Sequence, residues 1–302
     1  MKDALIRRIG FITQKDNGTV DISICNTPLN DATITEFNKK NGVLLDLRPV
    51  FVAFESLVLN HSELTQIPIN PNYNDVTSGY IEGLEVLTIA TQKISNFLSA
   101  ANFYLSIAKP KLENLFGSNS PEFRDWDDTR KKLHSENFSY KFSYALRNYS
   151  QHYGLPLSSI KLDQNNLLTP TPTKEIRIVI DTKVIFESSY AWKNTIKEDA
   201  KAQQNPIDMI KLCNHYMHII RQLHQKLLLV INGKVAELDH FLDRLREDFQ
   251  ISHIEQPIFF VSKYGDDPNN PSTQQEIPPF VEIKRLKEQR LKNDRTINEF
   301  SN

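Results

Sequence analysis

The feature that most constrains the fold is a helical repeat of apolar residues that runs unbroken from Met209 to Phe249. Spacings of three and four residues place these side chains on one face of a helix. The repeat passes through Asn232-Gly233, a pair that is otherwise typical of a turn. Because a glycine inside a helix costs only about 1 kcal/mol, we expect one helix over about 207–249, continuous or bent at Gly233. The apolar positions are Met209, Leu212, Tyr216, Ile220, Leu223, Leu227, Ile231, Val235, Leu238, Leu242, Leu245 and Phe249.

Three other stretches have the composition of β-strands. Residues 5–25 read as two strands joined at Asp16-Asn17-Gly18, which favours a hairpin turn. A second hairpin is expected from EIRIVI and KVIFES around Asp181-Thr182, and IEQPIFFVSKY predicts a further strand. Nearer the N-terminus, a short helix is expected from Asp31 to Lys40. The run VLLDL then reads as a strand, and Pro49 suits the first turn of the next helix.

The middle of the chain predicts helices with recognisable ends. A helix from about Tyr80 should be kinked or ended by Pro110 and closed by Gly117. Ser120-Pro121 reads as an N-cap and first turn, and a further helix should run from near Ser135 to the Arg147–His152 stretch. The fold class is therefore mainly α with small β additions (α+β). We expect an N-terminal β-containing cap (1–44), a helical bundle (45–157), a β-hairpin and long-helix region (171–264) and a charged C-terminal tail (265–302).

Composition narrows the class of protein. The formal net charge is −1, so no overall basic field attracts nucleic acid or an anionic membrane. Only Cys25 and Cys213 are present, far apart and without metal-site spacing, as is typical of a reducing compartment. No stretch has the length of a signal peptide's apolar core or of a membrane span. We expect a cytoplasmic protein that makes no membrane contact.

The stretch LRNYSQHYGLP carries the strongest functional signal. On a helical wheel with about 100° per residue, the apolar residues from Phe138 to Tyr153 share one face. Arg147 falls opposite that face, and His152 falls at its edge, about 140° from Arg147. The sector between them holds a polar, partly aromatic stripe, which should face solvent, a ligand or a second copy of the protein. Its members are Tyr144, Asn148 and Gln151.

This stretch resembles the motif of HEPN-domain ribonucleases, in which four to six residues separate an Arg from a His and a polar residue directly follows the Arg. Here the matching residues are Arg147, Asn148 and His152. The resemblance covers about residues 45–157 and implies a HEPN-like helical bundle. It implies a metal-independent endoribonuclease of the toxin or phage-defence kind, with these three residues catalytic. It also implies a homodimer in which two motifs meet at one cleft, with a neutralising protein as a candidate partner.

The chemistry follows from the residue types. RNA carries its own nucleophile, the 2′-hydroxyl, and a His can take its proton or protonate the leaving 5′-oxygen. An Arg can hold two phosphoryl oxygens and stabilise the charge that develops on them. We expect 2′,3′-cyclic phosphate ends, no cofactor and no metal, with Tyr144 and Gln151 contacting the RNA substrate. The alternative is a non-catalytic helical interaction or assembly protein with a degenerate HEPN-like bundle.

Other groupings have simpler interpretations. Arg246 and His253 also match the Arg-to-His spacing, but Glu247 follows the Arg. His215 and His218 share a helical face, whereas His224 lies about 180° away from His215, so the three cannot bind one metal ion from a single helix. Asp127 and Asp128 form a carboxylate pair or, more simply, belong to a solvated face of ion pairs. A glycine-rich phosphate loop and a G-x-S-x-G elbow are both absent from the sequence.

Overall fold

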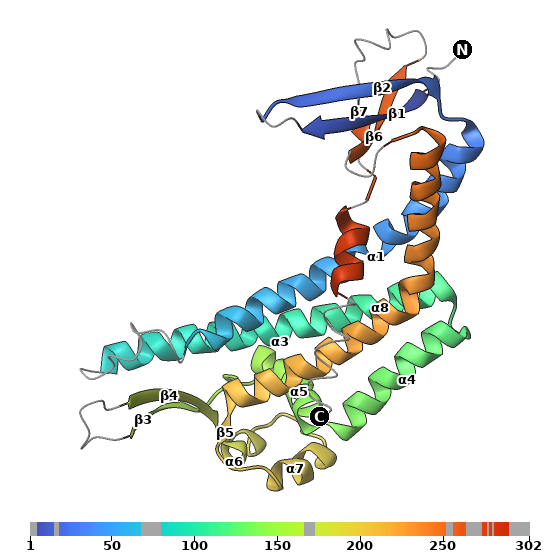
Figure 1. Cartoon of the computed structure of the whole chain (residues 1–302). Coiled ribbons are helices and arrows are strands. Elements are labelled where there is room, and N and C mark those ends of the chain that lie inside the picture. The colour runs from blue at the N-terminus through green and yellow to red at the C-terminus, as the bar shows by residue number, and fades with distance from the viewer. Residues whose placement is uncertain are drawn as a thin grey trace. The chain divides into compact units, whose positions relative to one another are not determined.

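The chain is mainly α with small antiparallel β-sheets, which confirms the predicted fold class (Figure 1). The computed structural model describes residues 5–14, 18–67, 80–165, 173–251, 256–263, 274–276, 278–279 and 281–289. The helices are α1 (Asp31–Thr65), α3 (Tyr80–Phe116), α4 (Pro121–Glu136), α5 (Phe138–His152), α6 (Thr182–Phe186), α7 (Asn194–Lys201) and α8 (Met209–Asp248). The strands are β1 (Leu5–Gln14), β2 (Val20–Pro28), β3 (Ser159–Asn165), β4 (Thr173–Ile180), β5 (Ile207–Asp208), β6 (Gln256–Lys263) and β7 (Gln274–Glu276).

The long helix α8 confirms the prediction made from its apolar repeat. It spans 40 residues and continues through Gly233. The residues of the repeat from Met209 to Leu245 are buried. Gly233 itself is exposed, and nothing lies within 4 Å of the place where a Cβ would stand. The apolar side chains buried before and after Asn232-Gly233 therefore keep this pair helical, although it is typical of a turn.

The strand and the new helix start that were predicted between Lys40 and Pro49 were wrong. α1 is one helix of 35 residues with Pro49 in its interior, so VLLDL is helical and not a strand. Its start is capped by Asn30, whose Oδ1 accepts a hydrogen bond from Thr33 N at 2.8 Å. A proline inside a helix costs about 3 kcal/mol. Each fully buried aliphatic side chain contributes about 1.5–3 kcal/mol, and the buried positions of α1 continue past Pro49 at helical spacing. They include Leu44, Leu47, Val50, Ala53, Phe54 and Leu57.

The end of α3 and the start of α4 agree with the residues that predicted them. α3 continues through Pro110 and ends at Phe116, after which Gly117 takes a φ of 87°. α4 begins as predicted, since Ser120 Oγ accepts a hydrogen bond from Phe123 N at 3.1 Å. The Pro- and Asn-rich stretch IPINPNYNDVTSG (67–79), whose composition predicts a loop, lies almost entirely outside the described residues, as does most of LTPTPTK (168–174), whose composition predicts a linker.

The sheets confirm the N-terminal hairpin and the predicted strand β6 but change the second hairpin. One sheet has the order β2-β1-β6-β7, so strands from both ends of the chain lie side by side (Figure 1). The other has the order β3-β4-β5. KVIFES was wrongly predicted to be a strand. Its first four residues belong to the helix α6, which Asp181 caps, since Asp181 Oδ1 accepts a hydrogen bond from Lys183 N at 3.0 Å. β4 pairs instead with β3, the segment that follows α5.

The chain forms two compact units, residues 1–46 with 231–302, and residues 47–230. The first contains the four-stranded sheet, and Phe37 packs there between Phe241 and Phe259, with ring centroids 6.3 and 4.8 Å away. The second contains α3–α7, the three-stranded sheet and the larger parts of α1 and α8. Its core holds the fully buried Trp126 and Tyr216. Among the described helices, none is long and apolar enough to cross a membrane.

Candidate functional site

α5, which carries the Arg147–His152 stretch, is buried on two opposite sides. On one side Phe142 and Tyr149 pack on Trp192, with ring centroids 5.7 and 5.4 Å away. On the other side Tyr140 contacts Tyr216 of α8 at 5.3 Å. α5 also contacts α3, α4 and α7. A helix enclosed in this way has only a narrow sector left for solvent.

The exposed sector of α5 is the polar stripe predicted from the wheel. Tyr144 is 44% exposed, Gln151 and His152 are exposed, and Asn148 is half-buried. His152 is the last residue of α5 and was expected at the edge of the core. That placement was wrong, because the neighbouring Tyr153 is itself 50% exposed and leaves His152 open to solvent. Among the described residues, none forms a hydrogen bond or ion pair with the His152 side chain.

Arg147 does not point fully into solvent, contrary to the wheel. It is half-buried, and its Nε is buried without a hydrogen-bond partner in the described part of the chain. Its Nη1 donates a hydrogen bond of 3.1 Å to Oδ1 of Asn148. The reason is that Tyr140 and Ser143, on the same side of α5, are buried as well. Arg147 and Asn148 are thus brought together, whereas Arg147 and His152 remain on different sides of the exposed sector.

The end of α5 is closed by aromatic rings. Tyr153 N donates to Tyr149 O at 2.9 Å, and the rings of Tyr149 and Tyr153 stack with centroids 6.3 Å apart. Tyr190 lies against both rings, at 5.9 and 5.1 Å. A Cβ on Gly154 would lie 2.4 Å from the Tyr149 hydroxyl oxygen, so any other residue here would have to displace the Tyr149 side chain. Tyr190 and Trp192 were not predicted as part of this site because KVIFES, just before them, was predicted to be a strand. Two aromatic residues in a short loop are nevertheless a usable packing signal.

The histidines of α8 have separate environments. His224 is buried, stacks on Phe54 with centroids 3.6 Å apart, and lies 3.2 Å from the Tyr104 hydroxyl through Nδ1. Burial lowers the pKa of His224 to about 3. His215 and His218 are exposed on another face. Among the described residues, no three His, Cys, Asp or Glu side chains are grouped so that they could hold a metal ion. The other Arg-to-His match ends at His253, which lies outside the described residues.

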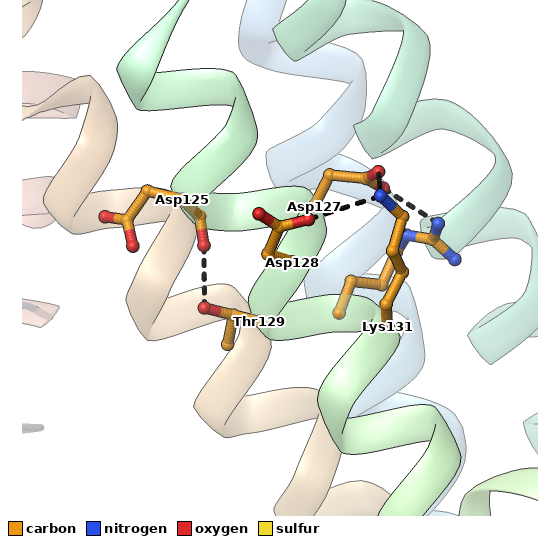
Figure 2. A network of polar contacts seen from close by, with 6 residues as sticks. Asp125, Asp127, Asp128, Thr129 and Lys131 are labelled. Atoms are coloured by element: carbon orange, nitrogen blue, oxygen red, sulfur yellow. Dashed lines mark hydrogen bonds and ion pairs between the residues drawn. The ribbon is translucent and has the colours of Figure 1, made fainter.

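The acidic cluster of α4 is a network of ion pairs (Figure 2). Asp127 is buried, and its carboxylate contacts Arg130 Nη2 at 2.8 Å and Lys131 Nζ at 2.9 Å. Burial alone would raise the pKa of Asp127, but the two cations outweigh that effect and lower it. Asp128 shares Lys131 at 3.2 Å. Since cations already contact both Asp127 oxygens, the two carboxylates are explained by ion pairs that stabilise α4.

Comparison with known proteins adds no assignment. No family model, no curated protein and no solved structure matches the chain. The site therefore has to be interpreted from its own residues.

Proposed function

We propose that the protein is a metal-independent endoribonuclease of HEPN type, with Arg147, Asn148 and His152 as its catalytic residues. The observation that carries this proposal is the exposed polar stripe of α5. An unpartnered His152 lies at one border of the stripe, and an arginine fixed by Asn148 lies at the other. A guanidinium has five N–H donors, and the contact with Asn148 uses one of them. Arg147 thus retains donors for phosphoryl oxygens.

In the proposed reaction the RNA 2′-oxygen attacks the adjacent phosphorus, and the bond from phosphorus to the 5′-oxygen breaks. His152 takes the 2′-hydroxyl proton or supplies the proton that the 5′-oxygen needs. Arg147 stabilises the negative charge on the phosphoryl oxygens. The products are a 2′,3′-cyclic phosphate and a 5′-hydroxyl. Tyr144 and Gln151 would contact the flanking nucleotide from the same exposed sector.

The proposed site combines two copies of the chain, because Arg147 and His152 lie about 140° apart on one helix. A homodimer would bring Arg147 of one copy toward His152 of the other. Mixing the variants Arg147→Met and His152→Ala tests this arrangement. A mixed dimer has one composite site with both residues intact, so cleavage should return to a fraction of the wild-type rate. No recovery in verified mixed dimers would show that the site is not shared.

The decisive assay measures cleavage of an RNA panel in EDTA by wild type and single variants. His152→Ala and Arg147→Met should each lose about 10²–10⁴ in rate. His240→Ala, which changes an exposed histidine of α8 far along the chain from the motif, is the matched control and should cleave normally. Melting curves must show that each variant is folded. If wild type leaves every RNA intact, the alternative of a non-catalytic interaction protein is favoured. Equal cleavage by Arg147→Met would refute the assignment.

A further inference from the structure

An unassigned feature is a cavity of about 450 Å³ in the unit formed by residues 47–230. It lies at the junction of α4 and α5 and is bounded by β4 and by the first turns of α8. Sites for small ligands in proteins commonly have volumes of about 300–1,000 Å³. The cavity touches α5 at Phe138 and Ser139, its first two residues, whereas His152 is its last. It is therefore separate along α5 from the proposed ribonuclease site.

One wall of the cavity is basic. Lys211, His215 and His218 follow one another at spacings of four and three residues, so they share a face of α8. Arg177 of β4 lines the cavity as well. The Lys211 side chain is exposed, and none of the described residues forms an ion pair with it. This wall offers several cationic or hydrogen-bonding groups to an anion of the size of a phosphate.

The start of α5 adds hydrogen-bond donors. Asn137 stands at the N-cap position but makes no capping hydrogen bond, because its Nδ2 donates to Leu133 O at 2.8 Å. The first amides of α5 therefore lack a side-chain acceptor, as at helix ends that bind anions. A second observation is independent of this. Ser139 lines the cavity and is only 8% exposed, yet no described residue forms a hydrogen bond with its hydroxyl. The hydroxyl of Ser139 can therefore form a hydrogen bond with a ligand in the cavity.

The rest of the cavity lining includes an aromatic ring and two side-chain carboxamides. Phe138 is half-buried and stacks on Phe142 with centroids 5.1 Å apart, which fixes its ring at the cavity. Gln203 and Gln204 bring carboxamides, which can pair with the edge of a nucleobase. Two acids are also present, Glu136 and Asp208, and Asp208 Oδ1 already accepts from Lys211 N at 3.1 Å. A simple anion would leave the aromatic ring and the carboxamides unused.

We infer that this cavity binds a mononucleotide. Its phosphate lies against Lys211, His215 and the uncapped start of α5, where Ser139 donates to it. Its base lies against Phe138, and Gln203 contacts the edge of the base. This site goes beyond the proposed ribonuclease function, since it needs neither Arg147 nor His152.

Calorimetric titration of the full chain tests the inference, with AMP, CMP, GMP and UMP as the probes and no RNA present. Ribose 5-phosphate and inorganic phosphate are the partial probes. At least one mononucleotide should bind more tightly than ribose 5-phosphate by about tenfold, because a base stacked on an aromatic ring adds to the affinity. Lys211→Gln should weaken that binding about tenfold or more, through loss of a charge-assisted hydrogen bond. Lys132→Gln, at an exposed lysine of α4 that does not line the cavity, is the matched control and should bind normally.

Three results would overturn the inference. One is the absence of binding by all four mononucleotides at millimolar concentration. Another is binding of inorganic phosphate as tight as that of the mononucleotides, which would leave no role for the base. The third is equal affinity of wild type and Lys211→Gln. Phe138→Leu gives a separate readout, since it should reduce the preference for the mononucleotide over ribose 5-phosphate and spare phosphate binding. Because no RNA is present, a failed ribonuclease assay and a failed titration are independent outcomes.

Discussion

The buried His224 should make the stability of the protein depend on pH between 7 and 5. It lies in the core of the 47–230 unit, 3% exposed, between the Phe54 ring and the Tyr104 hydroxyl. Among the described residues, no carboxylate pairs with it. Removal from water disfavours the charged imidazolium and lowers the pKa of His224 to about 3. In the unfolded chain the same side chain has a pKa of about 6.5.

The direction and size of this pH dependence follow from the difference in bound protons between the folded and the unfolded chain. A histidine whose pKa is lowered by folding contributes its full stability above pH 6.5, and that contribution is lost as the pH falls toward 3. Between pH 7 and pH 5 the unfolded chain takes up about 0.7 proton at this site, whereas folded His224 stays neutral. One pKa unit corresponds to 1.36 kcal/mol, so the free energy of unfolding should fall by about 2 kcal/mol over this range.

The assay is urea unfolding at pH 5, 6 and 7, followed by circular dichroism, for wild type and His224→Gln. Glutamine does not titrate and can still hydrogen-bond to the Tyr104 hydroxyl. The variant will be less stable at pH 7 because it loses the ring stacked on Phe54. The readout is therefore the change in unfolding free energy with pH, and that change should be smaller by about 2 kcal/mol than in wild type. His218→Gln, on an exposed face of α8, is the matched control and should retain the wild-type dependence.

Some pH dependence should survive in His224→Gln. Burial also lowers the pKa values of His61 and His134, and both effects act in the same direction. They are present in wild type and variant alike, so they cancel in the comparison. If the two proteins lose the same free energy between pH 7 and pH 5, His224 is not neutral and buried as the structure has it, and the reasoning fails.

Three further substitutions test the packing around the helices by thermal or urea unfolding. Gly233→Ala should stabilise α8 by about 0.5–1 kcal/mol, since the position is exposed, helical and open; a loss would mean that α8 is bent there in a way that needs glycine. Gly154→Ala should destabilise by about 1–3 kcal/mol, because its Cβ would displace the buried Tyr149 ring, and a neutral effect would contradict that contact. Arg147→Met keeps the buried stem and removes the unpartnered Nε, so it should leave stability unchanged or raise it; a loss above about 1 kcal/mol would reveal a partner.

Local signals predicted elements well where burial agreed with them. The apolar repeat of α8 and the Ser120 cap of α4 needed no knowledge of the rest of the chain. Pro49 and KVIFES led to wrong predictions, because a proline or a β-like composition changes the free energy of a local conformation by a few kcal/mol at most. Neighbouring elements decide at such positions: the buried face of α1 continues through Pro49, and Asp181 caps α6. The cavity beside α8 could not be predicted, since its lining comes from residues 136–139, Arg177 and residues 203–219, which are far apart in the sequence.

The placement of Arg147 shows why a helical wheel is insufficient for a site on an enclosed helix. A wheel assumes one buried face, so it assigned Arg147 to solvent and His152 to the core edge. α5 has two buried faces, one under Trp192 and one against Tyr216. Its solvent sector is shifted toward His152, so truncating His152 should cost less stability than truncating Arg147. Because His152 is exposed, loss of activity in His152→Ala would not be explained by unfolding. Arg147→Ala, in contrast, would remove a packed side-chain stem and so could lower stability as well as activity. Arg147→Met is consequently the variant that separates chemistry from packing.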